Sequence, residues 1–472
     1  MKKILIILLS IYFFSSSAFA INLSQALKEA YQNNPELNAE RENIKVSKSD
    51  LNISRSDFLP SVTLSGSKSS EDTSKLTNQD GTSATITDVN PETRSVKIEQ
   101  KIFKGFGGVA DFKKSKLGLD LADAKLLKSE QEILLKAVEA FSGMILANEK
   151  FSINERNVGL LERQVETDRI RLDRGEVSVA DLAQSESSLA EAQANFIQAK
   201  NAVVTARLNY ENVIGPIQDT FSLNKKSDLN IKIPMTLENA INISQTKNPE
   251  LIIAKLEYEQ SEQDVKISQS DLSPSATLSF ESKETDDLSS TLDQQDKETV
   301  QATVSWPIFS GGKNYAGLNK SKNLRNRKKL LLDNAMRINE TKVTTAWSNM
   351  KSNASMLESV RLQVNAAEIA NEGITAEYES GKGRSTLDVI QSNSILLNSV
   401  ELQVRAAEIA NEGITAEYES GVGRTTLEVI QSNSFLLNAQ ISLANSERNY
   451  LLSQFNLLKS IGLLNSSYLK IK

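Results

Sequence analysis

The hexapeptide PSVTLS at residues 60–65 returns as PSATLS at residues 274–279, and the tetrapeptide NPEL at 34–37 returns unchanged at 248–251. Both pairs are separated by the same 214 residues. Similarity at one constant offset is the mark of an internal duplication, and it should be recognised before any local pattern is interpreted. The sequence therefore predicts a chain made of two structural repeats.

The two predicted repeats, 21–216 and 217–472, follow the same order: a helix, a pair of strands and a long helical hairpin. The helices are expected at about 24–57 and 237–271, where the apolar spacing is helical. Each stops just before the proline of the hexapeptide, because proline lacks an amide proton and clashes with the preceding helical turn. The chain then changes to the alternating pattern of a strand.

Four segments alternate apolar and polar residues over 8 to 11 positions, which is the length of a membrane-spanning strand. The predicted strand pairs are 61–69 with 95–103, and 275–282 with 299–309. The intervening polar segments, 68–94 and 283–298, are expected to be exposed loops. The alternative is a pair of soluble hairpins on a globular domain, since membrane strands leave a weak signal in sequence.

Very long helices are expected after each second strand. No proline occurs from residue 92 to 215 or from 308 to the end, and apolar residues recur every three or four positions. Gly108 to Gly175 spans 67 residues and Gly312 to Gly381 spans 69. At 1.5 Å per residue each helix would extend on the order of 100 Å, enough to cross a periplasm. The first helical hairpin should turn near residue 175.

A second, more recent duplication interrupts the second hairpin. Residues 359–398 return almost unchanged as residues 399–438, with six differences. The copied unit carries a complete turn, so the sequence predicts two hairpin tips, near 381 and 421. Two successive reversals would send the last helix in the wrong direction. Either the extra 40 residues project as an added segment at the entrance, or the chain runs through one of the two tips as continuous helix.

The N-terminus predicts export. Lys2 and Lys3 precede an apolar run from Ile4 to Phe14, and the segment ends in Ala18-Phe19-Ala20. A short basic region, an apolar stretch and a small-x-small end predict a signal peptide over residues 1–20 that is removed after Ala20. An uncleaved anchor helix would need roughly 20 apolar residues.

The composition argues against most enzymes. The chain has no histidine and no cysteine, which removes Ser-His-Asp and Cys-His nucleophilic sites, His or Cys metal ligands and disulfides. The formal charge of −6, with cations and anions interspersed, makes nucleic acid an unsuitable partner. We expect no enzymatic activity, no metal and no cofactor.

Together these features resemble the TolC-type outer-membrane efflux family, on the strength of the duplicated half, the NPEL and Pro-Ser motifs and the segment EYESGKGRSTLDV at 377–389. The resemblance covers nearly the whole chain after residue 20. It implies a homotrimer in the outer membrane of a Gram-negative bacterium. Four strands per protomer would close a 12-stranded β-barrel in outer-membrane lipid, continued by a coiled-coil barrel of helices through the periplasm. It also implies a periplasmic adaptor (membrane fusion) protein and an inner-membrane ABC or proton-driven transporter as partners.

The resemblance also implies a periplasmic gate at the helix tips, where Tyr, Arg and acidic side chains bond between neighbouring helices. The gate positions by match are Tyr378, Arg384 and Asp388, their copies Tyr418, Arg424 and Glu428, and Arg174 and Asp181 in the first repeat. The tip turns would contain Gly175, Gly381, Gly383, Gly421 and Gly423. The plainer alternative is that Arg384 and Asp388 form an exposed i,i+4 helix pair of small energy.

The expected function is that of a passive conduit in a tripartite efflux or type I secretion system. The alternative from a different class is a periplasmic or surface coiled-coil scaffold or adhesin that transports nothing. The nature of the cargo is not encoded in any motif, because a wide water-filled tunnel needs no tailored pocket.

Overall fold

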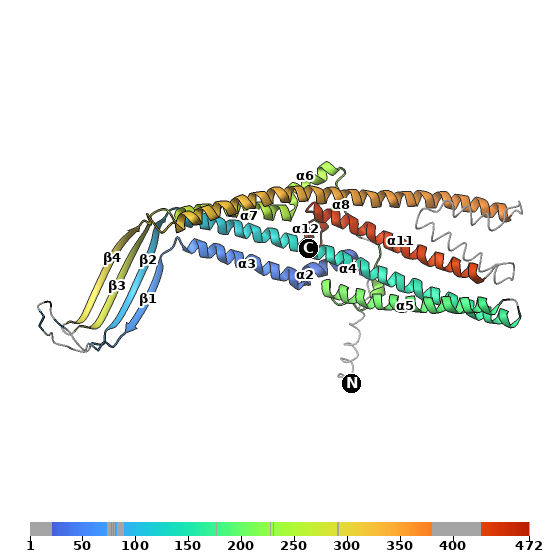
Figure 1. Ribbon diagram of the computed structural model, residues 1–472, viewed down its shortest axis with the longest axis horizontal. Coiled ribbons are helices and arrows are strands. Elements are labelled where there is room, and N and C mark those ends of the chain that lie inside the picture. The colour runs from blue at the N-terminus through green and yellow to red at the C-terminus, as the bar shows by residue number, and fades with distance from the viewer. Residues whose placement is uncertain are drawn as a thin grey trace, which may run out of the picture. The chain divides into compact units, whose positions relative to one another are not determined.

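The computed structural model of the protein describes residues 21–379 and 426–471, apart from gaps at 73–76, 78, 80, 83–88, 176, 227, 230 and 290–291, and it describes little beyond the backbone over 357–379 and much of 426–439. The chain is mainly helical with one antiparallel sheet (Figure 1). This confirms the predicted fold class of long helices combined with four strands. The predicted signal peptide and the tips near 381 and 421 lie outside the described residues.

The helix at the start of each repeat is divided in two, where the sequence predicted one continuous helix. The four helices are α2 (Leu23–Asn33), α3 (Pro35–Ser56), α6 (Leu237–Lys247) and α7 (Pro249–Ser270). The break falls at Asn34 and Asn248, whose backbones are extended. A residue before proline is driven out of the helical region, whereas proline itself suits the first position of a helix. The NPEL motif therefore ends one helix and starts the next.

The strands form a single sheet in the order β1-β2-β3-β4, with every neighbour antiparallel (Figure 1). Their bounds are β1 (Ser61–Lys68), β2 (Glu92–Lys104), β3 (Ser275–Ser289) and β4 (Leu292–Ser305). The second repeat thus lies beside the first within one sheet, through the pairing of β2 with β3. The outer edges of β1 and β4 have no strand partner in the described part of the chain.

Two expectations about the strands were wrong. Residues 283–298, expected to be a loop, form the end of β3 and the start of β4, paired up to Ser289 and Leu292. The expected loop was inferred from polarity, but a ladder is held by backbone hydrogen bonds, which residues with polar side chains form as readily as residues with apolar ones. The second strand of this pair ends at Ser305, not at Phe309, because Pro307 cannot donate to a ladder.

Long helices follow the second strand of each pair, as predicted, although the helix after β4 is described only up to Glu379 and the last one only from Thr426. They are α4 (Gly107–Asp173) and α8 (Lys313–Glu379), of 67 residues each, and α5 (Val179–Val213) and α11 (Thr426–Ser460), of 35 residues each. Two short elements complete the described part of the chain, the 3₁₀ turn η1 (Thr220–Ser222) and α12 (Ser466–Leu469). Among the described helices, none combines the length and apolar character needed to cross a membrane.

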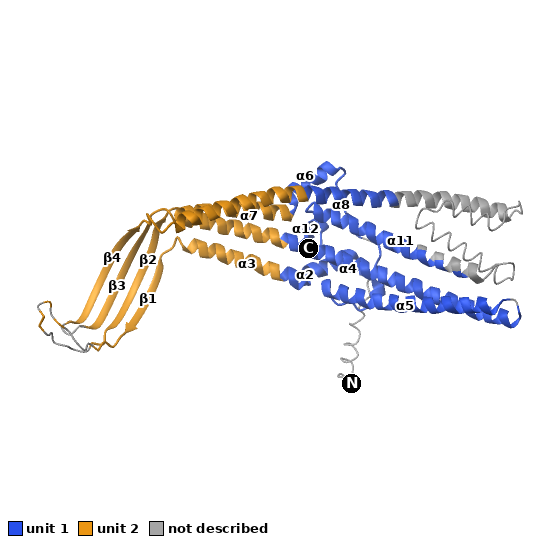
Figure 2. Cartoon of the chain, in the orientation of Figure 1, with its two compact units in different colours: residues 1–38, 127–248, 339–472 blue, residues 39–126, 249–338 orange. Residues whose placement is uncertain are grey.

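The chain divides into two compact units (Figure 2). Unit 2, residues 39–126 and 249–338, holds the sheet, α7, most of α3 and the first parts of α4 and α8. Unit 1, residues 1–38, 127–248 and 339–472, holds α2, α5, α6, α11, α12 and the remainders of α4 and α8. Most of the fully buried side chains are in unit 1, on α2, α4 and the end of α11. The largest of them are Leu23, Leu27, Leu37, Ile133, Leu134, Phe141, Met144, Tyr210, Phe455, Leu457 and Leu458.

Within unit 1, the asparagine of each NPEL motif pins the end of a hairpin. Asn34 donates its side-chain amide to the carbonyl of Val213, at 3.2 Å, and Asn248 donates to the carbonyl of Ser460, at 2.8 Å. These carbonyls lie in the last turns of α5 and α11, where the helix leaves its own acceptors unpaired. The repeated motif therefore fastens the return helix of each hairpin to the start of its repeat.

Candidate functional site

The sheet has two chemically different faces, and the strand register shows why. Val62 is paired with Ile98, Ile98 with Phe280 and Phe280 with Val300, so these four side chains form one row across all four strands. Paired residues in an antiparallel ladder point to the same face, and neighbours along a strand point to opposite faces. The apolar face therefore carries Val62, Leu64, Val96, Ile98, Leu278, Phe280, Val300 and Val304.

The opposite face is polar. The row next to the apolar one consists of Thr63, Lys97, Glu281 and Thr299. On the same face Lys97 forms an ion pair with Glu99 at 2.7 Å. This face is charged and hydroxyl-rich, as a water-facing surface would be.

The apolar face is not covered by the described chain. Leu64 is 79% exposed, and Val300 and Val304 are each 74% exposed. A contiguous apolar surface of this kind marks contact with a partner or with lipid. Every residue of β1 is exposed, so neither face of that strand is buried by any segment that the structure describes.

The first helical hairpin turns where the sequence predicted. Gly175 follows α4 with φ of 74° and donates its backbone N–H to the carbonyl of Leu172 at 2.8 Å. Glycine adopts this left-handed conformation without the steric cost that a Cβ would add. Arg174 lies beside it in the turn and is exposed.

Asp181 lies in a capping box at the start of α5. Its backbone N–H donates to the hydroxyl of Ser178 at 3.2 Å, and its carboxylate accepts from the Ser178 backbone at 2.9 Å and hydroxyl at 2.7 Å. These hydrogen bonds hold the pKa of the Asp181 carboxyl below its usual value. The residue that the sequence suggested as a gate acid is thus engaged in ending the turn, and its role as a gate stays a prediction.

We expect Ser178→Ala to reduce amide exchange protection in the first turn of α5, because loss of an N-cap typically costs about 1 kcal/mol. The pH dependence has a defined sign. Since the folded pKa of Asp181 is lowered, its contribution is present above the ordinary value of about 3.9 and is lost as pH falls through the folded pKa. Hydrogen exchange followed by mass spectrometry at several pH values measures both effects. The control is Ser446→Ala within α11, where the half-buried hydroxyl donates to the carbonyl of Ser442 and caps no helix end. Equal protection in all variants would contradict the cap.

The other predicted site residues receive no test from the structure. Arg384, Asp388, Tyr418 and Arg424 lie outside the described residues, as do Gly381, Gly383, Gly421 and Gly423. Tyr378 lies near the end of α8 and Glu428 near the start of α11, in parts of these helices whose side chains are not described.

A buried carboxylate near the tip escaped the sequence analysis. Asp168 is 0% exposed and accepts hydrogen bonds from the hydroxyl of Ser185 and from the side-chain amide of Gln164, the latter at 3.2 Å. Ser185 comes from α5, so this contact fastens the two arms of the hairpin together. The available signal was its spacing, since Asp168 continues the stripe of Leu161 and Val165.

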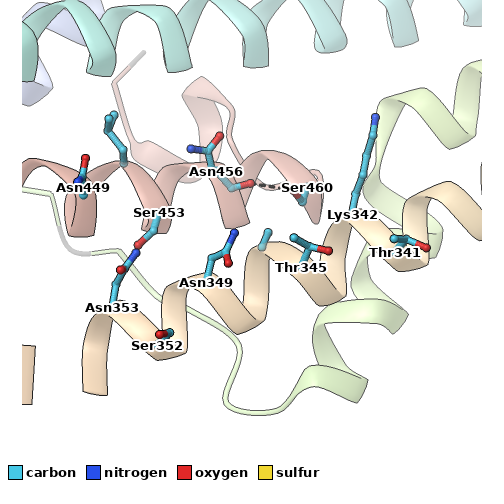
Figure 3. Close-up of a pocket in the computed structure, with 12 residues that line it drawn as sticks. Thr341, Lys342, Thr345, Asn349, Ser352, Asn353, Asn449, Ser453, Asn456 and Ser460 are labelled. Atoms are coloured by element: carbon cyan, nitrogen blue, oxygen red, sulfur yellow. Dashed lines mark hydrogen bonds between the residues drawn. The ribbon is translucent and has the colours of Figure 1, made fainter. Parts of the chain in front are cut away.

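A polar groove of about 750 Å³ lies between α8 and α11 in unit 1 (Figure 3). Its lining is mainly amide and hydroxyl groups, including Asn349 and Asn353 from α8 and Asn449 and Asn456 from α11. Figure 3 shows Ser460 donating its hydroxyl to the carbonyl of Asn456, at 2.9 Å. Among the residues that the structure describes, no cluster of three or more acidic side chains is arranged to hold a metal ion.

Comparison with known proteins agrees with this geometry. The model of a family described as "Outer membrane efflux protein" matches residues 26–215 and 240–398. The outer membrane efflux protein BepC of Brucella suis is 25% identical over 79% of this chain and 79% of its own length. The outer membrane protein TolC of Escherichia coli is 22% identical over 98% of this chain and 87% of its own length. The crystal structure of the Campylobacter jejuni CmeC outer membrane channel has the same fold, with a TM-score of 0.72 at 15% identity, covering 93% of this chain and 85% of that one.

Proposed function

The chain belongs to the outer membrane efflux protein family, and from this premise we propose that three copies form one passive conduit through the outer membrane and the periplasm. In each copy the sheet lies in the outer membrane and the long helices extend into the periplasm. The conduit performs no chemistry on its cargo, in keeping with a family of transport proteins.

The observation that carries the proposal is the two-faced sheet. Its apolar side chains, such as Leu64 and Val300, are exposed on one face, while Lys97 and Glu99 form an ion pair on the other. Lipid on one side and water on the other satisfy both faces at once. A hydrocarbon environment does not tolerate unpaired backbone groups, so the free edges of β1 and β4 require partners.

Three copies provide these partners. Four strands cannot close a barrel around a lumen, whereas the β4 edge of one copy can pair with the β1 edge of the next. Three sheets joined in this way give twelve strands, enough to enclose a small aqueous lumen. The apolar face would then contact lipid and the polar face would line the lumen.

The helices extend the lumen. The 67 residues of α4 and of α8 correspond to about 100 Å each, the distance needed to approach an inner-membrane partner. We propose that a periplasmic adaptor and an inner-membrane transporter, of the ABC or proton-driven type, supply the cargo and the energy. The water-filled conduit itself needs no binding pocket for its cargo.

Conductance tests this function directly. Purified protein in a planar lipid bilayer should give discrete single-channel currents, and outer-membrane extracts should contain a trimer that heating converts to monomer. A coiled-coil scaffold or adhesin would give no current. A monomeric protein that stays soluble without detergent and keeps its helices would overturn the proposal.

The periplasmic gate is part of the same proposal. We propose that Arg384 and its copy Arg424 form hydrogen-bonded ion pairs with carboxylates of neighbouring helices and so keep the entrance narrow, because arginine-carboxylate pairs are strong and directional. The support is the match of the segments 377–389 and 417–429 to the family's tip pattern.

Arg384→Ser combined with Arg424→Ser should raise the single-channel conductance in planar bilayers, since the proposed latch is lost. Arg163→Ser is the matched control, because Arg163 is an exposed α4 residue that, among the described residues, donates to the carbonyl of Gly159 in its own helix. Unchanged conductance in the double variant would argue against a latch.

A further inference from the structure

A second cavity in unit 1, of about 740 Å³, lies between α4, the segment after η1 and α11. It differs from the polar groove of Figure 3 in combining cations with apolar walls. None of its residues belongs to the sheet or to the predicted gate. Its charges and its apolar lining together define the ligand that it suits.

The two carboxylates at this cavity share one ion-pair partner. Lys225 lies between Glu149 of α4 and Glu447 of α11, with ion-pair distances of 2.6 Å and 2.5 Å. Burial acts against its charge, but the hydrogen bonds to both glutamates outweigh burial and raise the pKa of the Lys225 ammonium group. One cation therefore serves two anions and fastens the segment to both helices.

The guanidinium of Arg448 has a hydrogen-bond donor that the described part of the chain does not satisfy. It lies on α11 in the cavity wall, and its Nε is buried without a hydrogen-bond partner among the residues that the structure describes. One of its terminal nitrogens lies 4.0 Å from the position that a Cβ on Gly143 of α4 would occupy. A buried guanidinium N–H without an acceptor is costly, and a ligand acceptor would remove that cost if the Arg448 side chain rotates toward the cavity that it lines.

The local charge selects a singly charged ligand. Lys225 and Arg448 balance Glu149 and Glu447, and Lys226 adds one further cation to the lining. A monoanion would bring the site close to neutrality, whereas a dianion would meet the two glutamates with excess negative charge. A planar carboxylate also matches the fork of a guanidinium.

The walls select an apolar body for the ligand. Ile145 and Leu146 of α4 and Leu451 of α11 line the cavity, and Tyr450 adds an aromatic ring. All four are partly exposed, so a ligand would bury apolar surface that now contacts water. Apolar surface with a few placed polar groups is the usual composition of a small-molecule site.

We propose that this cavity binds a small amphipathic monocarboxylate, with its carboxylate on the Arg448 guanidinium and its apolar body against Ile145, Leu146 and Leu451. The site is not a consequence of the internal duplication. α5 and α11 end at corresponding residues, Val213 and Ser460, so the residue of α5 that corresponds to Arg448 is Asn201, which is uncharged. The binding goes beyond the conduit function and does not depend on it.

The test uses 4-phenylbutyrate as the probe and its neutral amide, 4-phenylbutyramide, as the comparison. Isothermal titration calorimetry is done on the full chain in a neutral detergent. The acid should bind at least about tenfold more tightly than the amide, since charge-assisted hydrogen bonds are roughly twice as strong as neutral ones. Arg448→Gln should weaken the acid by a similar factor, and Arg448→Lys should retain part of the binding, with a stronger dependence on salt.

Arg207→Gln is the matched control, because Arg207 lies on α5, is paired with Glu211 at 2.8 Å and does not line the cavity. It should bind the acid as the unaltered protein does. Equal affinity for acid and amide, unweakened binding to Arg448→Gln, or inorganic phosphate binding as tightly as the acid would each overturn the proposal. A protein that conducts no current but still binds the acid would leave this site standing and would contradict only the conduit function.

Discussion

Val300→Arg is expected to abolish the trimer recovered from outer membranes, whereas Gln301→Arg, one residue further along β4, is expected to leave it intact. Val300 is 74% exposed in the apolar row with Phe280, and Gln301 is paired with Ser279 on the polar face. Arginine on the lipid-facing side of a membrane strand costs about 2–4 kcal/mol near the midplane. Three copies would multiply this to about 6–12 kcal/mol per trimer. On the lumen side the same side chain stays in water.

The measurement is the amount of heat-modifiable trimer in outer-membrane extracts, with total protein as the reference. The two variants are closely matched, because both add an arginine to neighbouring positions of the same strand. Equal loss in both variants would mean that the two faces are not distinguished by lipid. Equal assembly in both would contradict the membrane location of this sheet.

Gly462→Ala is expected to lower the stability of the protein by about 2–5 kcal/mol, through two separate causes. Gly462 has φ of 82°, a left-handed conformation that costs an L-residue about 1–2 kcal/mol. A Cβ there would also overlap the carbonyl of Lys247, which is backbone and cannot rotate away. Overpacking of this kind adds about 1–3 kcal/mol.

The effect should spread beyond the loop, because Gly462 lies at a junction. Asn248 donates to the carbonyl of Ser460 and to the side-chain oxygen of Asn339, both at 2.8 Å, and Asn339 donates to the hydroxyl of Ser244 at 2.8 Å. Moving the chain at Gly462 away from Lys247 would disturb these buried hydrogen bonds between α6, α8 and α11.

Urea denaturation of the purified protein, followed by helical circular dichroism, measures the loss as a lower midpoint. Gly159→Ala is the control, because Gly159 lies within α4 with no atom near its would-be Cβ. That variant should be unchanged or slightly more stable, since alanine is a better helix former than glycine. A midpoint for Gly462→Ala equal to that of the control would contradict the close approach.

Local patterns predicted the long helices well. The absence of proline and the three-to-four spacing of apolar residues identified α4, and the start of α8, to within a few residues, because one continuous pattern over 67 positions leaves few alternatives. The same rules missed the break at Asn34 and Asn248. There the preference of a single residue before proline decided the backbone against the helical pattern on both sides.

The prediction of a loop between the strands of the second pair failed because it relied on polarity. The ends of β3 and β4 carry charged residues on both faces, so nothing in the alternation marks them as strand. Their pairing continues the register of the apolar part of the sheet, where Phe280 is paired with Val300. Backbone hydrogen bonds extend a ladder once it has begun, whatever side chains it carries.

By itself, the sequence determined the duplication, because the repeated motifs can be compared directly. It also determined the order of the elements, the alternation of each strand and the first turn at Gly175, because each of these depends on residues close together in the chain. Only the tertiary structure decided which strands are neighbours, that Asp168 is buried against Ser185 and that the buried Nε of Arg448 meets no acceptor among the described residues. Those facts depend on pairs of residues separated by as many as hundreds of positions. Their contact is set by how the apolar stripes of different helices are buried together, which no local spacing records.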